Sequence, residues 1–452
     1  MKKPRIVMVG GGSVQWMPRL LNDMMLKPGL EEAEYVLLDI SLPAAQRMAR
    51  YGQMLAARRK LPCTFKPMRD PRRAFPGAQV IIITISTGGL NAMEPDIAIP
   101  EQYGIFQTVG DTVGPGGWSR ALRNLPVFLE MGRTIAALAP DAWILNYTNP
   151  MSVLTQALCV TTDQPVVGLC HGVFENYAVL MKVFGLASEE EIQSRFGGIN
   201  HFFWILDFTV RGRPGYPLLR EKLRGRNFAE LVAEAYVDAA GFSSKYWLAG
   251  DLFNQFGYLP YIGDRHTAEF LPNCLAPDEK RLQQWRLVRT SVRERKERLR
   301  KNQERLAEWI AGKRPLPEDK PSRETAADIA AIRVRGGQLI DVVNVPNVGQ
   351  IPNLPTGAVV ESLGVVNALG FTPLAVGELP EPIVRLVRPH VENQEAILQA
   401  VVEEDAEKAM HALMNDPLCS HLPYARIREM AAELLAANRR LLPPPFGPKK
   451  WR

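Results

Sequence analysis

Two short polar turns in this chain hold side chains that commonly bind transition metals. Cys170 and His171 directly follow the apolar run Val166–Leu169, and Asn200 and His201 lie in a glycine-marked turn further along. A thiolate together with an imidazole suits a first-row transition metal, and two protein ligands leave positions open for substrate oxygens. The alternative is that Cys170 is an apolar filler at the end of a strand. Cys170 and His201 are therefore a candidate metal site.

A glycine-rich turn near the start of the chain predicts a nucleotide-binding site. The strand-like run RIVMV is followed by residues whose backbone can approach a pyrophosphate at a helix N-terminus, namely Gly10, Gly11, Gly12 and Ser13. Gln15 stands where the dinucleotide fingerprint has its third glycine, so the motif is incomplete. Asp39 ends the next strand-like run, where an acid accepts ribose hydroxyls and repels the extra phosphate of NADP. The segment favours NAD, with a simple strand, turn and capped helix as the alternative.

Polar residues after two later strand-like runs complete the predicted cofactor site. Thr84 lies in the run Ile83–Ser86, and Asn146 and Asn149 lie in the sequence NYTNP. Their hydroxyl and amide groups can face ribose, nicotinamide or substrate. Asn149 precedes a proline, which holds its backbone away from the helical region. A role as a turn former is the alternative for Asn149.

The elements that would position these residues alternate between strand-like and helical stretches. This alternation predicts βαβ units, and hence an α/β fold with a Rossmann-like, doubly wound parallel sheet. Such sheets bind ligands at the carboxyl ends of their strands, where the candidate residues lie. The strand-like runs are Ile6–Val9, Tyr35–Leu38, Val80–Ile85, Trp143–Leu145 and Val166–Leu169, with amphipathic stretches such as Met17–Met25 and Ala44–Arg59 between them.

The second half of the chain has a looser pattern. At 452 residues the chain exceeds what one hydrophobic core usually supports. We expect an NAD-binding domain over residues 1–204 and an interlocked α+β domain, which binds substrate, over residues 205–452. Helical stretches are predicted at Asn227–Ala240, Asp278–Ile310, Ser322–Val334, Pro382–Asn415 and Tyr424–Leu442, around strand-like pieces at Asp341–Val345 and Ala358–Leu363.

Composition limits the class of protein. The hydrophobic fraction of 46% and the charged fraction of 23% are ordinary for a globular chain. No apolar run approaches the roughly 20 residues of a membrane span, and the N-terminal apolar stretch ends in glycines too early for a signal peptide. The five scattered cysteines indicate reduced thiols. The mixed charges of residues 281–305 indicate a solvated helix rather than a nucleic-acid surface. We therefore expect a cytoplasmic protein that binds neither membrane nor nucleic acid.

Taken together, the motifs resemble those of glycoside hydrolase family 4, the NAD- and manganese-dependent glycosidases. The resemblance covers most of the chain, with GGGS at 10–13, DTVGPGG at 111–117, RALR at 120–123, NYTNPM at 146–151, GLCHG at 168–172, GINHF at 198–202 and NLPTGAVVE at 353–361. It implies NAD and Mn²⁺, or another divalent transition metal, as cofactors. It also implies hydrolysis without the usual carboxylate pair. The sugar would be oxidised at C3, lose its C2 proton with help from the metal, eliminate its C1 substituent, and be restored by water addition and hydride return.

The resemblance also implies roles for individual residues. Cys170 and His201 would match the metal ligands of the family, and Asn149 and Asn200 would contact substrate. Asp111, which opens the DTVGPGG motif, is placed with the substrate-binding residues.

His171 directly follows the metal cysteine, where some phosphoglucosidase members of the family carry Asp or Asn. The Cys-His pair is similar to the α-galactosidase and α-uronidase branch, which acts on sugars without phosphate. His171 can protonate the leaving oxygen, because an imidazole titrates near neutral pH. A hydrogen bond from His171 to a substrate hydroxyl is the alternative.

The base that removes the C2 proton is expected in FGYLPYIGDRHTAEF at 256–270, which matches the region where the phosphoglucosidase branch carries a tyrosine. Tyr261, Asp264 and His266 compete for this role. We favour Asp264, because a carboxylate beside Arg265 remains ionised, and Tyr261 comes next. A capping or ion-pair role is the alternative for Asp264.

Arg265 bears on the identity of the substrate. Arginine binds a planar carboxylate through two hydrogen bonds, and the GDRH stretch is similar to the uronide-acting members. We therefore expect an α-linked hexuronide, either a galacturonide or a glucuronide. A neutral α-galactoside or α-glucoside, or a sulfonated sugar, is the alternative, in which case Arg265 has a structural role paired with Asp264 or Glu269.

Two other classes of protein remain open from the sequence. A non-hydrolytic NAD-dependent dehydrogenase would share the glycine-rich turn but would consume NAD. An NAD sensor would keep the glycines and Asp39 but has no need for Cys170, His171 and His201 together. Family habit suggests that the chain forms a homodimer or homotetramer.

Overall fold

Six parallel strands form one half of a continuous sheet in the computed structural model, which describes residues 3–234 and 244–446. Their order is β3-β2-β1-β4-β5-β6, and every neighbouring pair is parallel. The order reverses between β1 and β4, which is where doubly wound folds bind nucleotides. The predicted Rossmann-like sheet is therefore confirmed. The bounds are β1 Arg5–Val9, β2 Glu34–Leu38, β3 Thr64–Met68, β4 Val80–Ile83, β5 Trp143–Asn146 and β6 Val166–Gly168.

Helices cover both faces of the parallel strands. In β1, Ile6 and Met8 belong to the apolar cluster that contains α1 and α2, whereas Val7 and Val9 belong to the cluster that contains α5 and α6. Successive side chains of a strand point to opposite faces, so a strand covered on both sides needs apolar residues throughout. The helices of this half are α1 Met17–Met25, α2 Leu42–Arg59, α3 Pro71–Ala74, α4 Gly89–Glu101, α5 Gly114–Leu138, α6 Met151–Cys159 and α7 Gly172–Phe184.

Antiparallel strands extend the same sheet beyond β6. Their order is β11-β12-β7-β8-β10, with β13 paired to β12 and β9 paired to β8. The β11–β12 pair inserts between β6 and β7, so that Asn344 pairs with Gly168 and Glu361 pairs with Gly198. The two halves are therefore interlocked through one sheet. The bounds are β7 Ile192–Ile199, β8 Phe202–Val210, β9 Arg213–Pro214, β10 Leu259–Pro260, β11 Gln338–Pro346, β12 Val359–Asn367 and β13 Gly370–Pro373.

The boundary predicted between residues 204 and 205 falls inside β8, which runs from Phe202 to Val210. β7 and β8 form one antiparallel hairpin, and both strands belong to the antiparallel part of the sheet. We therefore propose a division between the halves before β7, in place of the predicted boundary.

Two of the predicted long helices are interrupted by short non-helical segments, each of which contains a residue with positive φ. The stretch 278–310 divides into α13 and α14 because the chain turns at Arg286, whose φ is 53°. The stretch 382–415 divides at Glu404, whose φ is 55°. Such turns leave no signal in a hydrophobic pattern. Of the stretch 227–240, residues 228–234 are helical and the remainder after 234 lies outside the described residues. The helices of this half are α8 Gly215–Leu223, α9 Phe228–Glu234, α10 Trp247–Phe256, α11 Asp264–Thr267, α12 Pro272–Leu275, α13 Lys280–Gln284, α14 Val292–Ile310, α15 Ala326–Arg335, α16 Glu381–Val402, α17 Ala406–Met414 and α18 Tyr424–Asn438.

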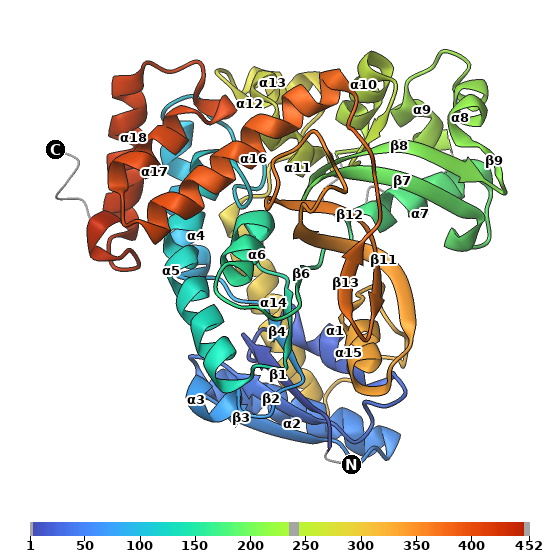
Figure 1. Ribbon diagram of the computed structural model, residues 1–452, viewed down its shortest axis with the longest axis vertical. Helices are drawn as coiled ribbons and strands as arrows, with labels where there is room; N and C mark the ends of the chain where they lie inside the picture. Colours follow the sequence, from blue (N-terminus) through green and yellow to red (C-terminus); the bar gives the residue numbers. More distant parts are fainter. Residues whose placement is uncertain (1–2, 235–243, 447–452) are drawn as a thin grey trace.

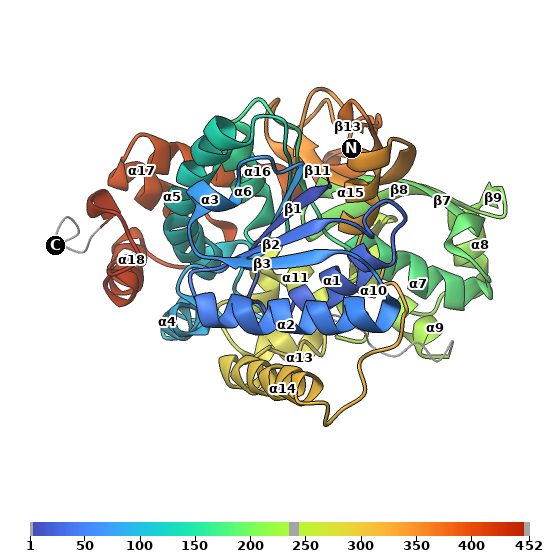
Figure 2. The same cartoon turned by 90° about the horizontal axis from the view of Figure 1, so that it is seen from below.

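The molecule has a lower part built on the parallel strands and an upper part crossed by β7, β8 and β12 (Figure 1). From below, α2 lies along β3 and β2, with α14 beyond it (Figure 2). Tyr51 of α2 stacks on Trp309 of α14, with ring centroids 5.3 Å apart, so α14 is fixed to the parallel half by its apolar side. Among residues 3–234 and 244–446, no helix is long and apolar enough to span a membrane.

Candidate active site

The glycine-rich turn after β1 packs so closely on its neighbours that side chains are excluded. A Cβ on Gly10, whose φ is 84°, would meet the Thr84 carbonyl oxygen at 2.5 Å. A Cβ on Gly12 would meet the Ala44 Cβ at 2.5 Å. Gly11 packs in the same way on the backbone of β2. The turn therefore holds its backbone at the switch point between β1 and β4, as a dinucleotide site requires.

Asp39 lies beside this turn at the end of β2. Its carboxylate accepts hydrogen bonds from the backbone N–H groups of Gly12, at 2.9 Å, and Ser41, at 2.8 Å. Ile40 is 90% exposed and offers an apolar surface on which a purine ring can pack. Ser13 Oγ accepts a hydrogen bond from the Trp16 N–H at 3.3 Å, close to the start of α1. These features fit the adenosine end of NAD.

Thr84 and Asn146 lie behind the loops that they were expected to line. Thr84 Oγ1 donates to the Val9 carbonyl oxygen at 3.3 Å. The fully buried Asn146 donates to Thr155 Oγ1 at 3.0 Å and accepts from the Thr148 N–H at 2.8 Å. These bonds within the protein favour a role for Thr84 and Asn146 in supporting the loops that would face the cofactor, and their direct contact with NAD stays a prediction.

Asn149, by contrast, has an oxygen available to a ligand. Its Oδ1 accepts no hydrogen bond from the residues that the structure describes, although the atom is buried. Its backbone carbonyl accepts a hydrogen bond from Arg120 Nε at 2.8 Å. Asn149 is thus held in place by its backbone while its side chain remains free to bind.

His201 occupies the tight turn between β7 and β8 and belongs to a group of metal-binding side chains. Its φ of 65° is uncommon for a residue other than glycine. Its Nδ1 lies 3.1 Å from Thr112 Oγ1, and its ring stacks on His266 with centroids 3.7 Å apart. Ligand atoms of Asp111, His201 and His266 all lie within 4.8 Å of one another. Two imidazoles and a carboxylate at this spacing suit a divalent transition metal.

Cys170 is half-buried just beyond the end of β6; it is not one of the three grouped residues, and it contacts Asn200, which directly precedes His201 in the chain. The Asn200 side chain is in hydrogen-bond contact with the Cys170 thiol, and its Nδ2 donates to Glu361 Oε2 at 3.2 Å. Burial raises the pKa of the Cys170 thiol, and the nearby Glu361 raises it further. A bound cation would lower the pKa of this thiol, because a thiol that coordinates a metal is deprotonated.

The protonation states of the three grouped residues suit metal binding. Burial opposes ionisation of Asp111, but the positive charge that His266 carries when it is protonated, together with the charges of Arg120 and Arg295, outweighs burial and holds the pKa of this carboxyl below its usual range. Burial lowers the pKa of His201, and it lowers the pKa of His266 to about 4. Both imidazoles are therefore neutral near pH 7, which is the form that binds metals.

A chain of hydrogen-bonding groups runs beside the metal-ligand group. The Tyr261 hydroxyl donates to Glu175 Oε2 at 3.2 Å. Glu175 Oε1 lies 3.9 Å from His171 Nε2, and His171 Nδ1 lies 3.5 Å from Glu324 Oε1. A Cβ on Gly263 would meet the Tyr261 ring at 2.3 Å, so glycine is required there for the ring to reach this position. The structure therefore connects two of the predicted catalytic residues, Tyr261 and His171, through Glu175.

Asp264 has a different position from the one expected of a base. Its fully buried carboxylate accepts hydrogen bonds from the backbone of Leu248 and Ala249, the latter at 3.0 Å, in the first turn of α10. Burial raises the pKa of Asp264 to about 7, and the backbone N–H groups offset part of this rise. Asp264 caps α10 and holds it against α11. This position favours the capping role that was the alternative for Asp264, and the role of Tyr261, the second candidate for the base, stays a prediction.

Arg265 points toward the residues that precede and begin α14. Its Nη1 donates to Thr290 Oγ1 at 3.2 Å, and the negative charge of Glu294 acts on it. An ion pair with Glu269 was one alternative for Arg265. Glu269 instead accepts hydrogen bonds from two backbone N–H groups, each at 2.7 Å.

Arg120 and Arg295 are functional candidates that the sequence analysis missed. The positive charges of both residues lower the pKa of Asp111. Arg120 also donates a hydrogen bond to the backbone of Asn149. Arg295 reaches in from α14 and donates to the Val109 carbonyl oxygen at 3.0 Å. The RALR motif contained Arg120, but nothing in the pattern of the charged stretch 281–305 distinguished Arg295 from its solvated neighbours.

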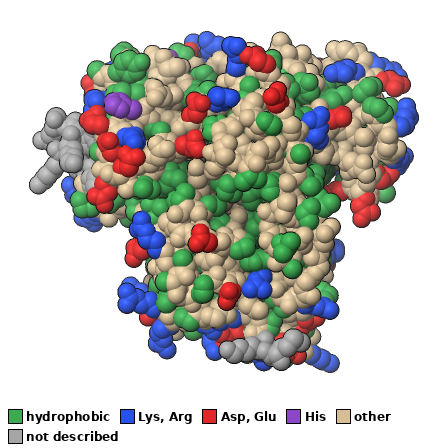
Figure 3. Space-filling view, viewed as in Figure 1, with side chains coloured by type: hydrophobic (Ala, Val, Ile, Leu, Met, Phe, Trp, Pro, Cys, Tyr) green, Lys and Arg blue, Asp and Glu red, His purple; other side chains and the backbone are tan. Residues whose placement is uncertain are grey.

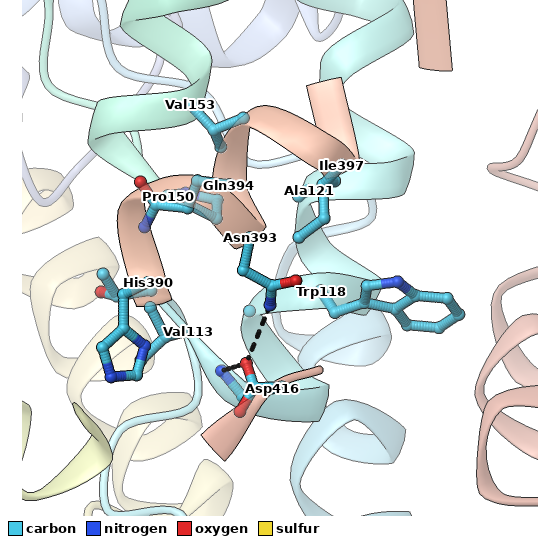
Figure 4. Close-up of a pocket in the computed structure, with 13 residues that line it drawn as sticks. Val113, Trp118, Ala121, Pro150, Val153, His390, Asn393, Gln394, Ile397 and Asp416 are labelled. Carbon is cyan, nitrogen blue, oxygen red and sulfur yellow. Dashed lines mark hydrogen bonds between the residues drawn. The ribbon is translucent and has the colours of Figure 1, made fainter. Parts of the chain in front are cut away.

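A small cavity of about 10 Å³ lies between α5 and α16 (Figure 4), and Thr112 is among the residues that line it. Asp416 Oδ2 accepts hydrogen bonds from the Gly114 N–H at 3.0 Å and from Asn393 Nδ2 at 3.5 Å. Burial raises the pKa of Asp416 to about 6. These bonds fix the start of α5, and thereby Thr112, which orients His201.

The fold and the site together define a dinucleotide-binding enzyme with a metal-ligand group at the junction of the parallel and antiparallel halves. Residues 5–186 match the Family 4 glycosyl hydrolase model, and residues 196–419 match the Family 4 glycosyl hydrolase C-terminal domain. The chain belongs to this family, and it is a glycoside hydrolase.

Individual relatives agree with this assignment. The chain is 35% identical over 423 residues to an alpha-galacturonidase of Bacillus subtilis, which covers 92% of this chain and 93% of that protein. The crystal structure of lplD from Bacillus subtilis superimposes with a TM-score of 0.85 at 32% identity, covering 96% of this chain and 100% of that one. A 6-phospho-alpha-glucosidase from gut microorganisms, solved with NAD and Mn²⁺, shares the fold with a TM-score of 0.78 at 22% identity, covering 98% and 99% of the two chains.

Proposed function

We propose that this glycoside hydrolase cleaves α-linked hexuronides and requires NAD and a divalent transition metal, with Mn²⁺ as the first choice. The observation that carries the proposal is the grouping of Asp111, His201 and His266 beside the chain of residues that contains Tyr261 and His171. The likeness to an alpha-galacturonidase supports a galacturonide as the first substrate to test.

The residues of the site fit both cofactors. The turn Gly10–Ser13, with Asp39 and the exposed Ile40, would hold the adenosine and pyrophosphate of NAD. His201, His266 and Asp111 would hold the metal, and Cys170 is retained as the further ligand predicted from the sequence. When bound, NAD would supply a reversible hydride acceptor, and the metal would supply positive charge for the substrate oxygens.

Tyr261 is the residue proposed to take the proton from C2 of the sugar. Its hydroxyl already donates to Glu175, so the phenol proton can pass to Glu175 Oε2 as the phenol oxygen receives the C2 proton. Burial raises the pKa of Glu175, which makes this carboxylate a stronger proton acceptor. His171 lies at the other oxygen of Glu175 and is proposed to protonate the leaving oxygen from Nε2.

We propose that Arg120 binds the carboxylate of the uronide substrate, and Arg265 is the second candidate for this role. Arg120 is nine-tenths buried, and its positive charge lowers the pKa of Asp111. Its Nε donates a hydrogen bond to the backbone carbonyl of Asn149. Its terminal nitrogens can bind a planar carboxylate through two hydrogen bonds. Asn149 Oδ1 and the Asn200 amide would bind sugar hydroxyls.

A second copy of the chain is the proposed protein partner. Apolar side chains gather in a band across the middle of one face, at the level of α6 and the strands β11 to β13 (Figure 3). Exposed apolar residues in or next to these elements are Ile340 of β11, Val160 directly after α6, and Leu369 in the turn between β12 and β13, which is 89% exposed. A contiguous apolar band of this kind is typical of an oligomer interface. The cytoplasm is the proposed compartment, because Cys170 must stay reduced to bind a metal.

The experiment that tests the proposal is hydrolysis of the 4-nitrophenyl α-galacturonide, α-glucuronide, α-galactoside and α-glucoside, with NAD, Mn²⁺ and a thiol reductant present. Cleavage of a uronide that stops when either NAD or metal is withheld supports the proposal. Cleavage of the neutral glycosides alone keeps the enzyme class and overturns the carboxylate assignment. Consumption of NAD without release of nitrophenol would instead indicate a dehydrogenase.

A further inference from the structure

A pocket of about 300 Å³ opens on the solvent side of His171 and is not used by the steps described above. It lies between α7, the first turn of α1 and the segment before α15. His171 and Glu175 are among the residues that line it. Because His171 is the residue proposed to protonate the leaving oxygen, the group that leaves with that oxygen must lie next to His171. This argument rests on the proposed function.

The pocket is lined by both hydrogen-bond donors and hydrogen-bond acceptors. The Arg323 guanidinium lies over the Phe174 ring, with 3.6 Å to the centroid, and bonds Glu189 at 3.2 Å. Arg19, in the first turn of α1, bonds Glu324 at 3.1 Å. The side chains of Arg19 and Arg323 remain about half exposed, with relative exposures of 52% and 48%. Each arginine therefore keeps N–H groups that a ligand hydroxyl can bind.

We propose that this pocket is the leaving-group subsite and that it takes a neutral, hydroxyl-bearing sugar. The substrate would then be a disaccharide or a longer oligosaccharide that ends in a uronic acid. Arginine and glutamate side chains held in place by one another, beside an aromatic ring, provide the mixed donors and acceptors that sugar hydroxyls need.

The charges of the pocket distinguish a neutral sugar from a second uronic acid. The carboxylates that line it are Glu175, Glu189 and Glu324, and the basic groups that line it are Arg19, Arg323 and His171. Each basic group already faces a carboxylate of the pocket. An additional carboxylate on the leaving sugar would therefore find no unpaired basic group to bind, whereas sugar hydroxyls can donate to the carboxylates and accept from the guanidiniums.

The first test fills the pocket from an exposed position. Ala178 lies on the solvent-exposed side of α7 and lines the pocket, so Ala178→Trp places a large side chain there without disturbing the core. The quantity measured is the ratio of kcat/KM for a uronosyl disaccharide with a neutral second hexose to kcat/KM for the methyl uronide. We expect this ratio to fall about tenfold or more in Ala178→Trp, since the larger leaving group loses its place. Ala437→Trp, at an exposed alanine of α18, is the matched control and should keep the ratio of the unaltered enzyme.

An unchanged ratio in Ala178→Trp, in a protein whose thermal midpoint matches that of the control, would overturn the subsite. If Ala178→Trp does not fold, Ala178→Leu gives the same comparison with a smaller side chain. The glycone is tested separately by the methyl glycosides. If a methyl galactoside is cleaved and the methyl uronides are not, the proposed function fails, and the same ratio measured with galactosyl substrates still decides the subsite.

The second test addresses the charge of the leaving sugar. The unaltered enzyme should cleave the disaccharide with a neutral second hexose with a kcat/KM about tenfold above that for a disaccharide of two uronic acids. Glu189→Gln removes one negative charge from the pocket and should narrow this preference. A preference for the doubly acidic disaccharide would overturn the assignment of a neutral leaving sugar.

Discussion

Substitution of Asp264 separates a helix cap from a catalytic base. Its carboxylate is fully buried and accepts the Ala249 N–H at 3.0 Å in the first turn of α10. Removal of a helix cap costs about 0.5–2 kcal/mol, and a buried N–H left unpaired costs about 1–3 kcal/mol. Asp264→Ala should therefore lower the free energy of unfolding by about 1–3 kcal/mol. Asp264→Asn keeps one acceptor oxygen and should lower it by less.

The same variants have an expected effect on catalysis. Asp264→Asn should retain kcat within about tenfold, because its side chain contacts the backbone of α10, whereas Tyr261→Phe should lower kcat by about 10²–10⁴-fold as expected for loss of a general base. The assays are urea unfolding followed by circular dichroism and steady-state hydrolysis of a methyl α-uronide. The reasoning is refuted if Asp264→Asn loses activity by the larger factor while its unfolding free energy is unchanged.

Three further outcomes follow from the structure. Arg120→Met should raise KM for a uronide about tenfold or more, in keeping with the loss of a charged hydrogen bond, and Arg265→Met should raise it less; the opposite ranking would return the role to Arg265. His201→Ala and His266→Ala should each weaken Mn²⁺ binding in calorimetry at least about tenfold, and unchanged affinity in either variant would remove that residue from the ligand group. Burial raises the pKa of Asp416 to about 6 from 3.8, so the folded state binds this proton more tightly than the unfolded state. Its stabilising effect is present below about pH 4 and is lost, by an amount on the order of 3 kcal/mol, as the pH rises through about 6. Asp416→Asn should flatten that part of the profile of unfolding free energy against pH, and an unaltered profile would contradict the assignment.

The parallel half of the fold could be predicted from the sequence because strands covered on both faces need uninterrupted apolar residues. The run Ile6–Val9 and its equivalents therefore carry a strong signal. The place of β11 and β12 could not be predicted in this way. Their strand character was visible, but no local pattern shows that Asn344 and Glu361 insert between β6 and β7. That long-range pairing is what brings Glu361 to Asn200 and Cys170.

The candidate site shows the same division between local and long-range information. The position of Asp39 beside the glycine-rich turn was predictable, because the turn and Asp39 directly follow two strands that are neighbours in a doubly wound sheet. The grouping of His201 with His266 depends on the β7–β8 turn meeting α11, which are far apart in the chain. Asp264 illustrates the converse, since its residue type suited a base while its burial under α10 makes it a cap.

The central claim is that a uronide is hydrolysed through removal and return of the proton at C2, with Tyr261 as the base. The most direct measurement is hydrolysis of methyl α-galacturonide in D₂O, with NAD and Mn²⁺ present, followed by NMR analysis of the product. The account predicts deuterium at C2 of the released galacturonic acid, and loss of both deuterium incorporation and hydrolysis in Tyr261→Phe. Hydrolysis that leaves hydrogen at C2 would contradict it.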